Sequence, residues 1–71
     1  MQLADAKGGQ TVTIVSNNAH GKAFARLNSL GLMEGQKLRV LSSGFPGLIV
    51  DIKGSRLAIC KSAARDMEVS L

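Results

Sequence analysis

The sequence predicts a small, mostly β fold in which about five short strands close into a barrel, with one helix and one helical turn. Apolar and polar residues alternate in several short runs, which is the pattern of half-buried strands. Eight glycines in 71 residues indicate frequent turns between short elements. Because a sheet of this size has exposed edges unless it closes on itself, we expect a barrel.

The length and composition restrict what such a chain can do. A chain of 71 residues forms one domain at most, and it buries only roughly 60% of the surface that its unfolded form exposes. Such a domain supports one thin core and no deep enzyme cleft. Hydrophobic residues make up 45% of the sequence, which is enough for a globular fold and argues against disorder.

The first elements follow from local patterns. Leu3 is expected to anchor the N-terminal residues on the core. Residues 11–15 read TVTIV and predict a strand whose Val12 and Ile14 face inward. Polar loop residues come next, and residues 22–30 then predict a helix of about two to three turns. The apolar stripe of that helix consists of Phe24, Leu27 and Leu30.

The helix is expected to end abruptly at a corner that contains two glycines. Gly31 suits a left-handed residue at the helix end, and Leu32 can fold back onto the last turn and the core. Gly35 suits a turn position with positive φ. Residues 37–43 then alternate as a half-buried strand, with Leu38 and Val40 inward.

The C-terminal half predicts a hairpin, a helical turn and a last strand. Pro46 is expected to lie outside any central strand. Residues 48–60 read as two strands joined by a turn over residues 53–55, followed by an alanine-rich helical turn at 61–66 and a strand at 67–71. The expected inner faces are Leu48, Val50, Ile52, Leu57 and Ile59 in the hairpin, and Met67, Val69 and Leu71 in the last strand.

The corner also carries a resemblance. The stretch RLNSLGLMEGQKLRVL, residues 26–41, resembles the signature of the ferrous iron transport protein A (FeoA) family, an Arg-Leu-x-x-Leu-Gly-Leu helix end followed by a glycine turn and a strand. The similarity extends to GGQTVTI at 8–14, GFPG at 44–47 and SRLAICKSAARDMEV at 55–69. Family members often have arginine where this chain has Cys60 and Lys61.

The resemblance implies that residues 1–71 form a single SH3-like domain. It implies a small cytoplasmic accessory protein that works with FeoB, the membrane transporter of ferrous iron that hydrolyses GTP. The same fold resembles the C-terminal domain of metal-dependent repressors, so a free-standing relative of that domain is an alternative. Because the sequence starts at Met1 and no DNA-binding helices precede the domain, the accessory protein is the better fit.

Charge suggests a rival function. The net charge is +4 and the isoelectric point is about 9.9, but the basic residues are scattered and form no run. The positive electrostatic field of such a protein favours binding to acidic proteins, nucleic acid or anionic lipid about equally. Small barrels that bind single-stranded RNA stack bases on aromatic side chains. Because Phe24 and Phe45 are the only aromatic residues, RNA binding is the weaker alternative and we expect no nucleic-acid partner.

The residue types needed for catalysis or metal binding are sparse. The five carboxylates are dispersed, and His20 and Cys60 have no neighbours that mark a triad or a metal motif. A ferrous site needs several His or carboxylate ligands, so we expect neither enzyme activity, nor a cofactor, nor a tight iron site on the monomer. No signal peptide or apolar span is recognisable, which predicts a cytoplasmic protein without membrane insertion.

The predicted functional surface is the helix-to-strand corner. A barrel of 71 residues cannot bury every apolar residue of this dense cluster, and exposed apolar atoms near basic side chains suit docking on an acidic, partly apolar protein face. Residual strand edges could also pair copies of the chain into a weak homo-oligomer. The residues expected to contact the partner are Arg26, Leu27, Leu30, Leu32 and Met33.

Overall fold

The computed structural model describes residues 1–18, 31–44 and 46–71. The helix predicted over residues 22–30 lies outside these ranges. Five antiparallel strands form one sheet in the order β4-β3-β2-β1-β5, which confirms the mostly β prediction. The strands are β1 (Thr11–Asn17), β2 (Lys37–Ser43), β3 (Gly47–Ile52), β4 (Ser55–Cys60) and β5 (Met67–Ser70), and the short helices are η1 (Leu3–Asp5) and α2 (Lys61–Arg65).

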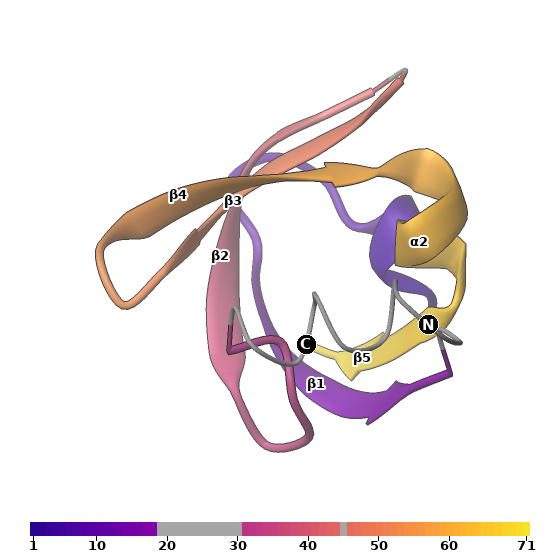
Figure 1. The fold of residues 1–71 in the computed structure, drawn as a ribbon. Helices are drawn as coiled ribbons and strands as arrows, with labels where there is room; N and C mark the ends of the chain where they lie inside the picture. The colour runs from indigo at the N-terminus through magenta and orange to yellow at the C-terminus, as the bar shows by residue number, and fades with distance from the viewer. Residues whose placement is uncertain (19–30, 45) are drawn as a thin grey trace.

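The sheet curls around a common interior (Figure 1). β1 and β5 lie on one side of that interior, β3 and β4 cross the opposite side, and η1 and α2 lie side by side between the two ends of the sheet. Register shifts between Ile14 and Ser16 and between Val40 and Ser42 bend the sheet at two of its strand pairs. This arrangement is the SH3-like barrel that the sequence led us to expect.

One side of each strand supplies the core. The predicted inward positions of β1, β2 and β3 are all buried, and Leu3, the first residue of η1, is fully buried as well. Leu57 packs against the core while remaining partly exposed. The buried apolar residues of the described ranges are Leu3, Ala4, Ala6, Val12, Ile14, Leu32, Leu38, Val40, Leu48, Val50, Ile52, Ile59, Ala64, Met67 and Val69.

Leu71 departs from its predicted inward position. The alternation that buries Met67 and Val69 would continue to residue 71 only if the strand did. β5 ends at Ser70, so the last residue lies beyond the strand pairing that holds Met67 and Val69 against the core. The side chain of Leu71 is consequently 76% exposed.

The β3–β4 hairpin is regular and tightly turned. Its loop consists of Lys53 and Gly54, which both have positive φ (54° and 86°), as a type I′ turn requires. The turn is shorter than the predicted 53–55, because Ser55 already pairs with Ile52. The Gly54 backbone N–H donates to Asp51 Oδ1 at 2.9 Å, which further fixes the turn. Pairing then continues to Cys60 without a register shift.

The two edges of the sheet differ. Gln2 forms a bridge with Glu68, and the Val69 backbone N–H donates to the Met1 carbonyl at 2.7 Å, so the first residues cover the outer edge of β5. The Met1 amine lies 3.4 Å from Glu68 Oε1 and adds an ion pair there. In the described part of the chain, no strand pairs with the outer edge of β4.

Gly47 allows β3 and β4 to approach. A Cβ at this position would collide with the Ile59 carbonyl and lie 2.9 Å from Cys60 Cα, and both obstacles belong to the backbone of β4. Backbone atoms cannot rotate away as a flexible side chain can. Glycine is therefore required here by the close approach of two strands.

We predict that Gly47→Ala lowers the free energy of unfolding by about 2 kcal/mol, because one of the two strands must shift. Chemical denaturation of the variant measures this loss. Gly44→Ala is the matched control, since no described residue other than its chain neighbour comes within 4 Å of the added Cβ, and its effect should stay below about 0.5 kcal/mol. Equal stability of the two variants would contradict the steric explanation.

Candidate protein-docking site

The predicted docking corner contains a tight turn whose conformation depends on glycine. The Gln36 backbone N–H donates to the Met33 carbonyl at 3.1 Å, which closes a four-residue turn. Gly35 occupies the third position with φ of 85°, as a type II turn requires. Gly31 also has positive φ (93°), as predicted for the residue that follows the helix. Both glycines therefore adopt the backbone conformations that the sequence led us to expect.

The corner is fastened to β1 by three hydrogen bonds. The Gly35 backbone N–H donates to the Ile14 carbonyl at 2.8 Å, and the Ile14 N–H donates in turn to the Gln36 carbonyl at 2.9 Å. The Asn17 Nδ2 atom donates to the Leu32 carbonyl at 3.2 Å. These bonds hold the corner in one position relative to the barrel, so a side chain at its tip has a fixed place.

Leu32 and Met33, although adjacent, have opposite environments. Leu32 is 0% exposed and packs in the core, whereas Met33 is 47% exposed. The predicted docking surface is corrected accordingly, because a fully buried Leu32 supports the corner from beneath and offers no contact area. Met33 alone is accessible among the predicted contact residues that the structure describes. Arg26, Leu27 and Leu30 lie outside the described residues.

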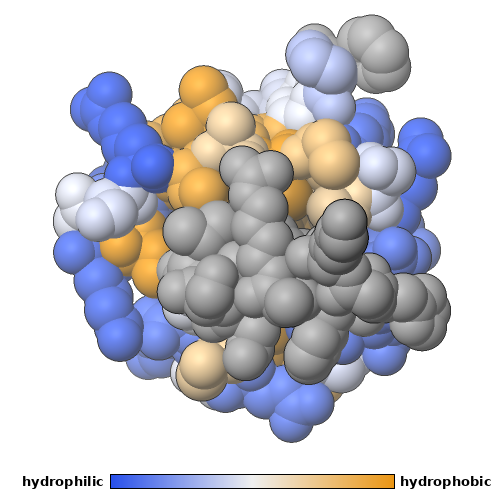
Figure 2. Space-filling model, viewed as in Figure 1, coloured by the Kyte–Doolittle hydropathy of each residue, from blue (hydrophilic) through white to orange (hydrophobic). Residues whose placement is uncertain are grey.

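The lysine and arginine side chains of the described ranges form no ion pairs with the carboxylates there. All five carboxylates lie within these ranges, and among the described residues only Glu68 forms an ion pair, with the Met1 amine. Figure 2 shows the resulting surface, on which hydrophilic residues frame hydrophobic ones. The basic residues without an ion pair in the described ranges are Lys7, Lys37, Arg39, Lys53, Arg56, Lys61 and Arg65.

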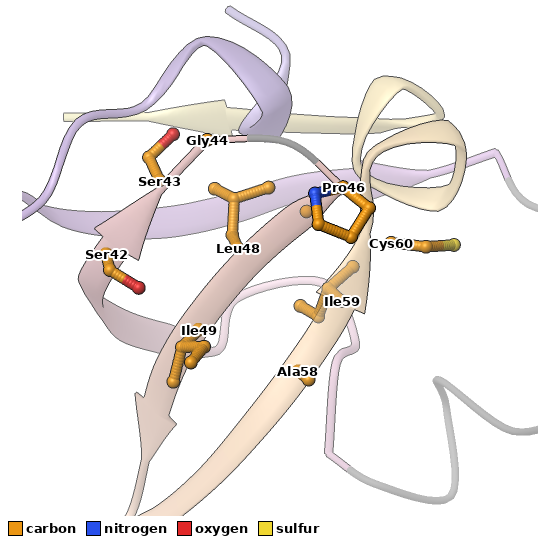
Figure 3. A pocket seen from close by; sticks show the side chains of 10 residues that line it. Ser42, Ser43, Gly44, Pro46, Leu48, Ile49, Ala58, Ile59 and Cys60 are labelled. Carbon is orange, nitrogen blue, oxygen red and sulfur yellow. The ribbon is translucent and has the colours of Figure 1, made fainter.

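A second feature, a shallow hollow of about 650 Å³, lies where β2 leads into β3 (Figure 3). Leu48 and Ile59 lie toward its interior, and Pro46 lies beside the end of β4. Sequence reasoning did not find this hollow, because it forms between strands and depends on their register. Its remaining lining residues are Ser42, Ser43, Gly44, Gly47, Ile49, Ala58 and Cys60.

The hollow has few reactive groups. Among the described residues that line it, none is a carboxylate or a histidine. Cys60 is exposed, and its Sγ lies 3.4 Å from Ser62 Oγ. The lining is suited to contact with apolar groups rather than to acid–base chemistry.

Metal ligands are not gathered in the ranges that the structure describes. No three His, Cys, Asp or Glu side chains there lie close enough together to hold a metal ion. His20, the one histidine of the chain, is outside these ranges. A search of the same ranges finds no helix with the length and apolarity needed to cross a bilayer.

In the described residues, a curled five-stranded sheet surrounds one thin core, with a helical turn before β1 and another before β5, and this arrangement defines an SH3-like β-barrel protein. The FeoA domain model matches residues 1–71, and the chain belongs to the FeoA family. A protein of Methanocaldococcus jannaschii named Fe(2+) transport protein A is 36% identical over 67 residues, which are 94% of this chain and 82% of that protein. The family assigns the chain to ferrous iron transport.

Solved structures have the same fold. The crystal structure of an iron uptake regulatory protein (FeoA) superimposes with a TM-score of 0.88 at 30% identity, over 97% of this chain and 93% of that one. The solution NMR structure of the FeoA protein of Chlorobium tepidum superimposes with a TM-score of 0.87 at 31% identity. The match covers 97% of this chain and 68% of that one. IdeR of T. acidophilum gives 0.89 at 17% identity over 33% of its chain, which shows a shared fold only.

We predict that Gly35→Ala destabilises the protein by roughly 1 kcal/mol, because a side chain disfavours positive φ, although no described residue other than its chain neighbours comes within 4 Å of the added Cβ. Gly35→Asn should cost less, since asparagine tolerates this conformation better. Thermal unfolding of both variants measures the order. If Gly35→Asn lowered the stability as much as Gly35→Ala, a cause other than backbone conformation would explain the destabilisation.

Proposed function

We propose that this protein is a cytoplasmic accessory protein of ferrous iron uptake that binds FeoB, the membrane transporter that hydrolyses GTP, and modulates or assembles it. Membership in the FeoA family and the 36% identity to a protein named for Fe(2+) transport support the pathway. The docking itself is supported by the geometry of the corner. The protein acts by contact and performs no chemical turnover of its own.

The observation that carries the proposal is the exposure of Met33 on a rigid corner. A methionine is flexible and polarisable and adapts to irregular apolar surfaces. Here its backbone is held by the turn from Met33 to Gln36 and by the bonds of that turn to β1. Such a side chain offers apolar area for burial in a complex, while the partner need not order the surrounding backbone.

Charge supports an acidic partner surface. The net charge is +4, and the basic side chains of the described ranges, apart from the Met1 amine, have no ion-paired carboxylate. An unneutralised positive field accelerates association with an acidic face and weakens as salt is added. The apolar contact at Met33 and the positive field together fit a partner surface that is acidic and partly apolar.

The composition of the described surface favours contact over catalysis. The hollow is lined by apolar and hydroxyl groups, and no cluster of metal-ligating side chains is found in the described ranges. Under this proposal, iron and GTP are handled by the transporter. The accessory protein changes the transporter only through the free energy of binding.

We predict that Met33→Glu weakens binding to the transporter about tenfold or more, because the complex would bury a carboxylate in place of an apolar side chain. The variant should remain folded, since Met33 is exposed. The measurement is co-purification of a tagged copy from the native membrane, followed by titration against the detergent-solubilised transporter.

Leu41→Glu is the matched control, because it places the same charge at an exposed leucine of β2 outside the corner. Undiminished binding by a folded Met33→Glu protein would show that the surface is wrongly placed. Failure of the unaltered protein to recover a GTP-hydrolysing membrane protein would contradict the proposed function itself.

A further inference from the structure

We propose that the outer edge of β4 binds an extended, acidic segment of a partner protein as an added antiparallel or parallel strand. The segment would carry an acidic side chain opposite Arg56 and an apolar one opposite Ala58. This surface is separate from the corner at Met33, and the proposal does not depend on the partner being the iron transporter.

The register of the hairpin determines which backbone groups of β4 face outward. In a hairpin with a two-residue loop, the closing pair exchanges both hydrogen bonds, and here that pair is Ile52 and Ser55. Every second residue pair along the hairpin also exchanges both hydrogen bonds, and the last of these pairs within the two strands is Leu48 and Ile59. The Lys61 backbone N–H donates to the Pro46 carbonyl at 2.9 Å, as this register requires. The N–H and C=O groups of Arg56 and Ala58 therefore point away from β3.

These outward groups have no strand beside them in the described ranges. The sheet order ends at β4, whereas the opposite edge at β5 is covered by Met1 and Gln2. Two of the features that usually protect an edge are missing from β4, because it contains no proline and its pairing with β3 has no bulge. The turn that joins β3 and β4 projects from the barrel (Figure 1).

Charge indicates the chemistry of the added strand. Lys53, Arg56 and Lys61 lie in the hairpin turn, in β4 and directly after it, and none of them forms an ion pair in the described ranges. Asp51 is the carboxylate opposite Arg56 across the hairpin, and one of its oxygens accepts the hydrogen bond from Gly54. An extended segment along this edge would meet positive charge along its length, so acidic residues are favoured.

The outer face of the hairpin indicates the apolar position. Ala58 pairs with Ile49, which is 44% exposed, and both lie on the side of the sheet away from the core. Arg56 lies two residues from Ala58 and therefore on the same side. A side chain opposite Ala58 would extend this row and cover part of Ile49, because alanine leaves space beside it.

A second copy of this chain fits the edge less well. Antiparallel pairing of two β4 strands about Ala58 would place Arg56 of each copy opposite Cys60 of the other, next to Lys61. Arg56 of one copy would then lie near Lys61 of the other at both ends of the added pair, and β4 contains no carboxylate to offset these charges. Two basic groups brought near each other repel, whereas an acidic segment is attracted, so an acidic segment is the preferred occupant.

The test is selection of random linear peptides displayed on phage against the full chain. The selected sequences should be acidic, with an apolar residue two positions from an acidic one and no proline in the contact segment. Hydrogen exchange followed by NMR should show slower exchange of the Arg56 and Ala58 amides when a selected peptide is bound. Failure to select any peptide, or unchanged exchange at these two amides, would overturn the proposal.

Variants separate edge pairing from general attraction. Ala58→Pro removes an outward N–H and no bond to β3, so the hairpin should fold, while peptide binding should weaken about tenfold or more. Arg56→Glu should weaken binding of the acidic peptide by about tenfold or more, whereas Lys7→Glu, with the same change in net charge before β1, should have a smaller effect.

Retained binding by a folded Ala58→Pro protein would overturn strand addition, and so would equal effects of Arg56→Glu and Lys7→Glu. Should Ala58→Pro fail to fold, the amide exchange of the unaltered protein decides the question. Slow exchange of both amides without peptide, appearing only at high protein concentration, would instead show that the edge pairs with a second copy and would overturn the acidic segment.

Discussion

The fold depends on burying one side of every strand in a single shared core. No element of a chain this small has a second hydrophobic layer to pack against, so each strand must contribute its inner residues to the same interior. That requirement makes the sheet curl, and the curling requires close approaches such as the one at Gly47. The bulges next to Ile14 and Val40 meet the same need, because they bend strands that would otherwise lie flat.

Curling leaves two strand edges, and the molecule treats them differently. Backbone bonds from Met1 and Gln2 cover β5, while the described residues leave β4 without a neighbour. Covering an edge satisfies its backbone groups within the chain, and leaving one uncovered keeps those groups hydrated and available. The difference makes β4 a surface on which backbone pairing can add a partner without any rearrangement of the core.

The corner and the edge would recognise a partner in different ways. Met33 offers an apolar side chain on a backbone that is already ordered, whereas β4 offers hydrogen-bonding groups flanked by basic side chains. Neither surface needs a reactive group, which agrees with the proposed role of the protein as a binding partner. A basic domain with unpaired charges gains association rate from an acidic surface, and the short-range contacts then determine how long the complex lasts.

The sequence by itself determined the family, the strand positions and the glycine-dependent turns, because alternation and glycine conformation are local properties that neighbouring residues encode. The alternation is seen at Leu38 and Val40 in β2, and the glycine conformation is seen at Gly31 and Gly35. Only the tertiary structure decided that Leu32 is buried while Met33 is exposed, that Leu71 lies beyond its strand, and that no strand of the described residues pairs with the outer edge of β4. Burial and pairing depend on which distant segments come to lie alongside a residue, and no short stretch of sequence contains that information.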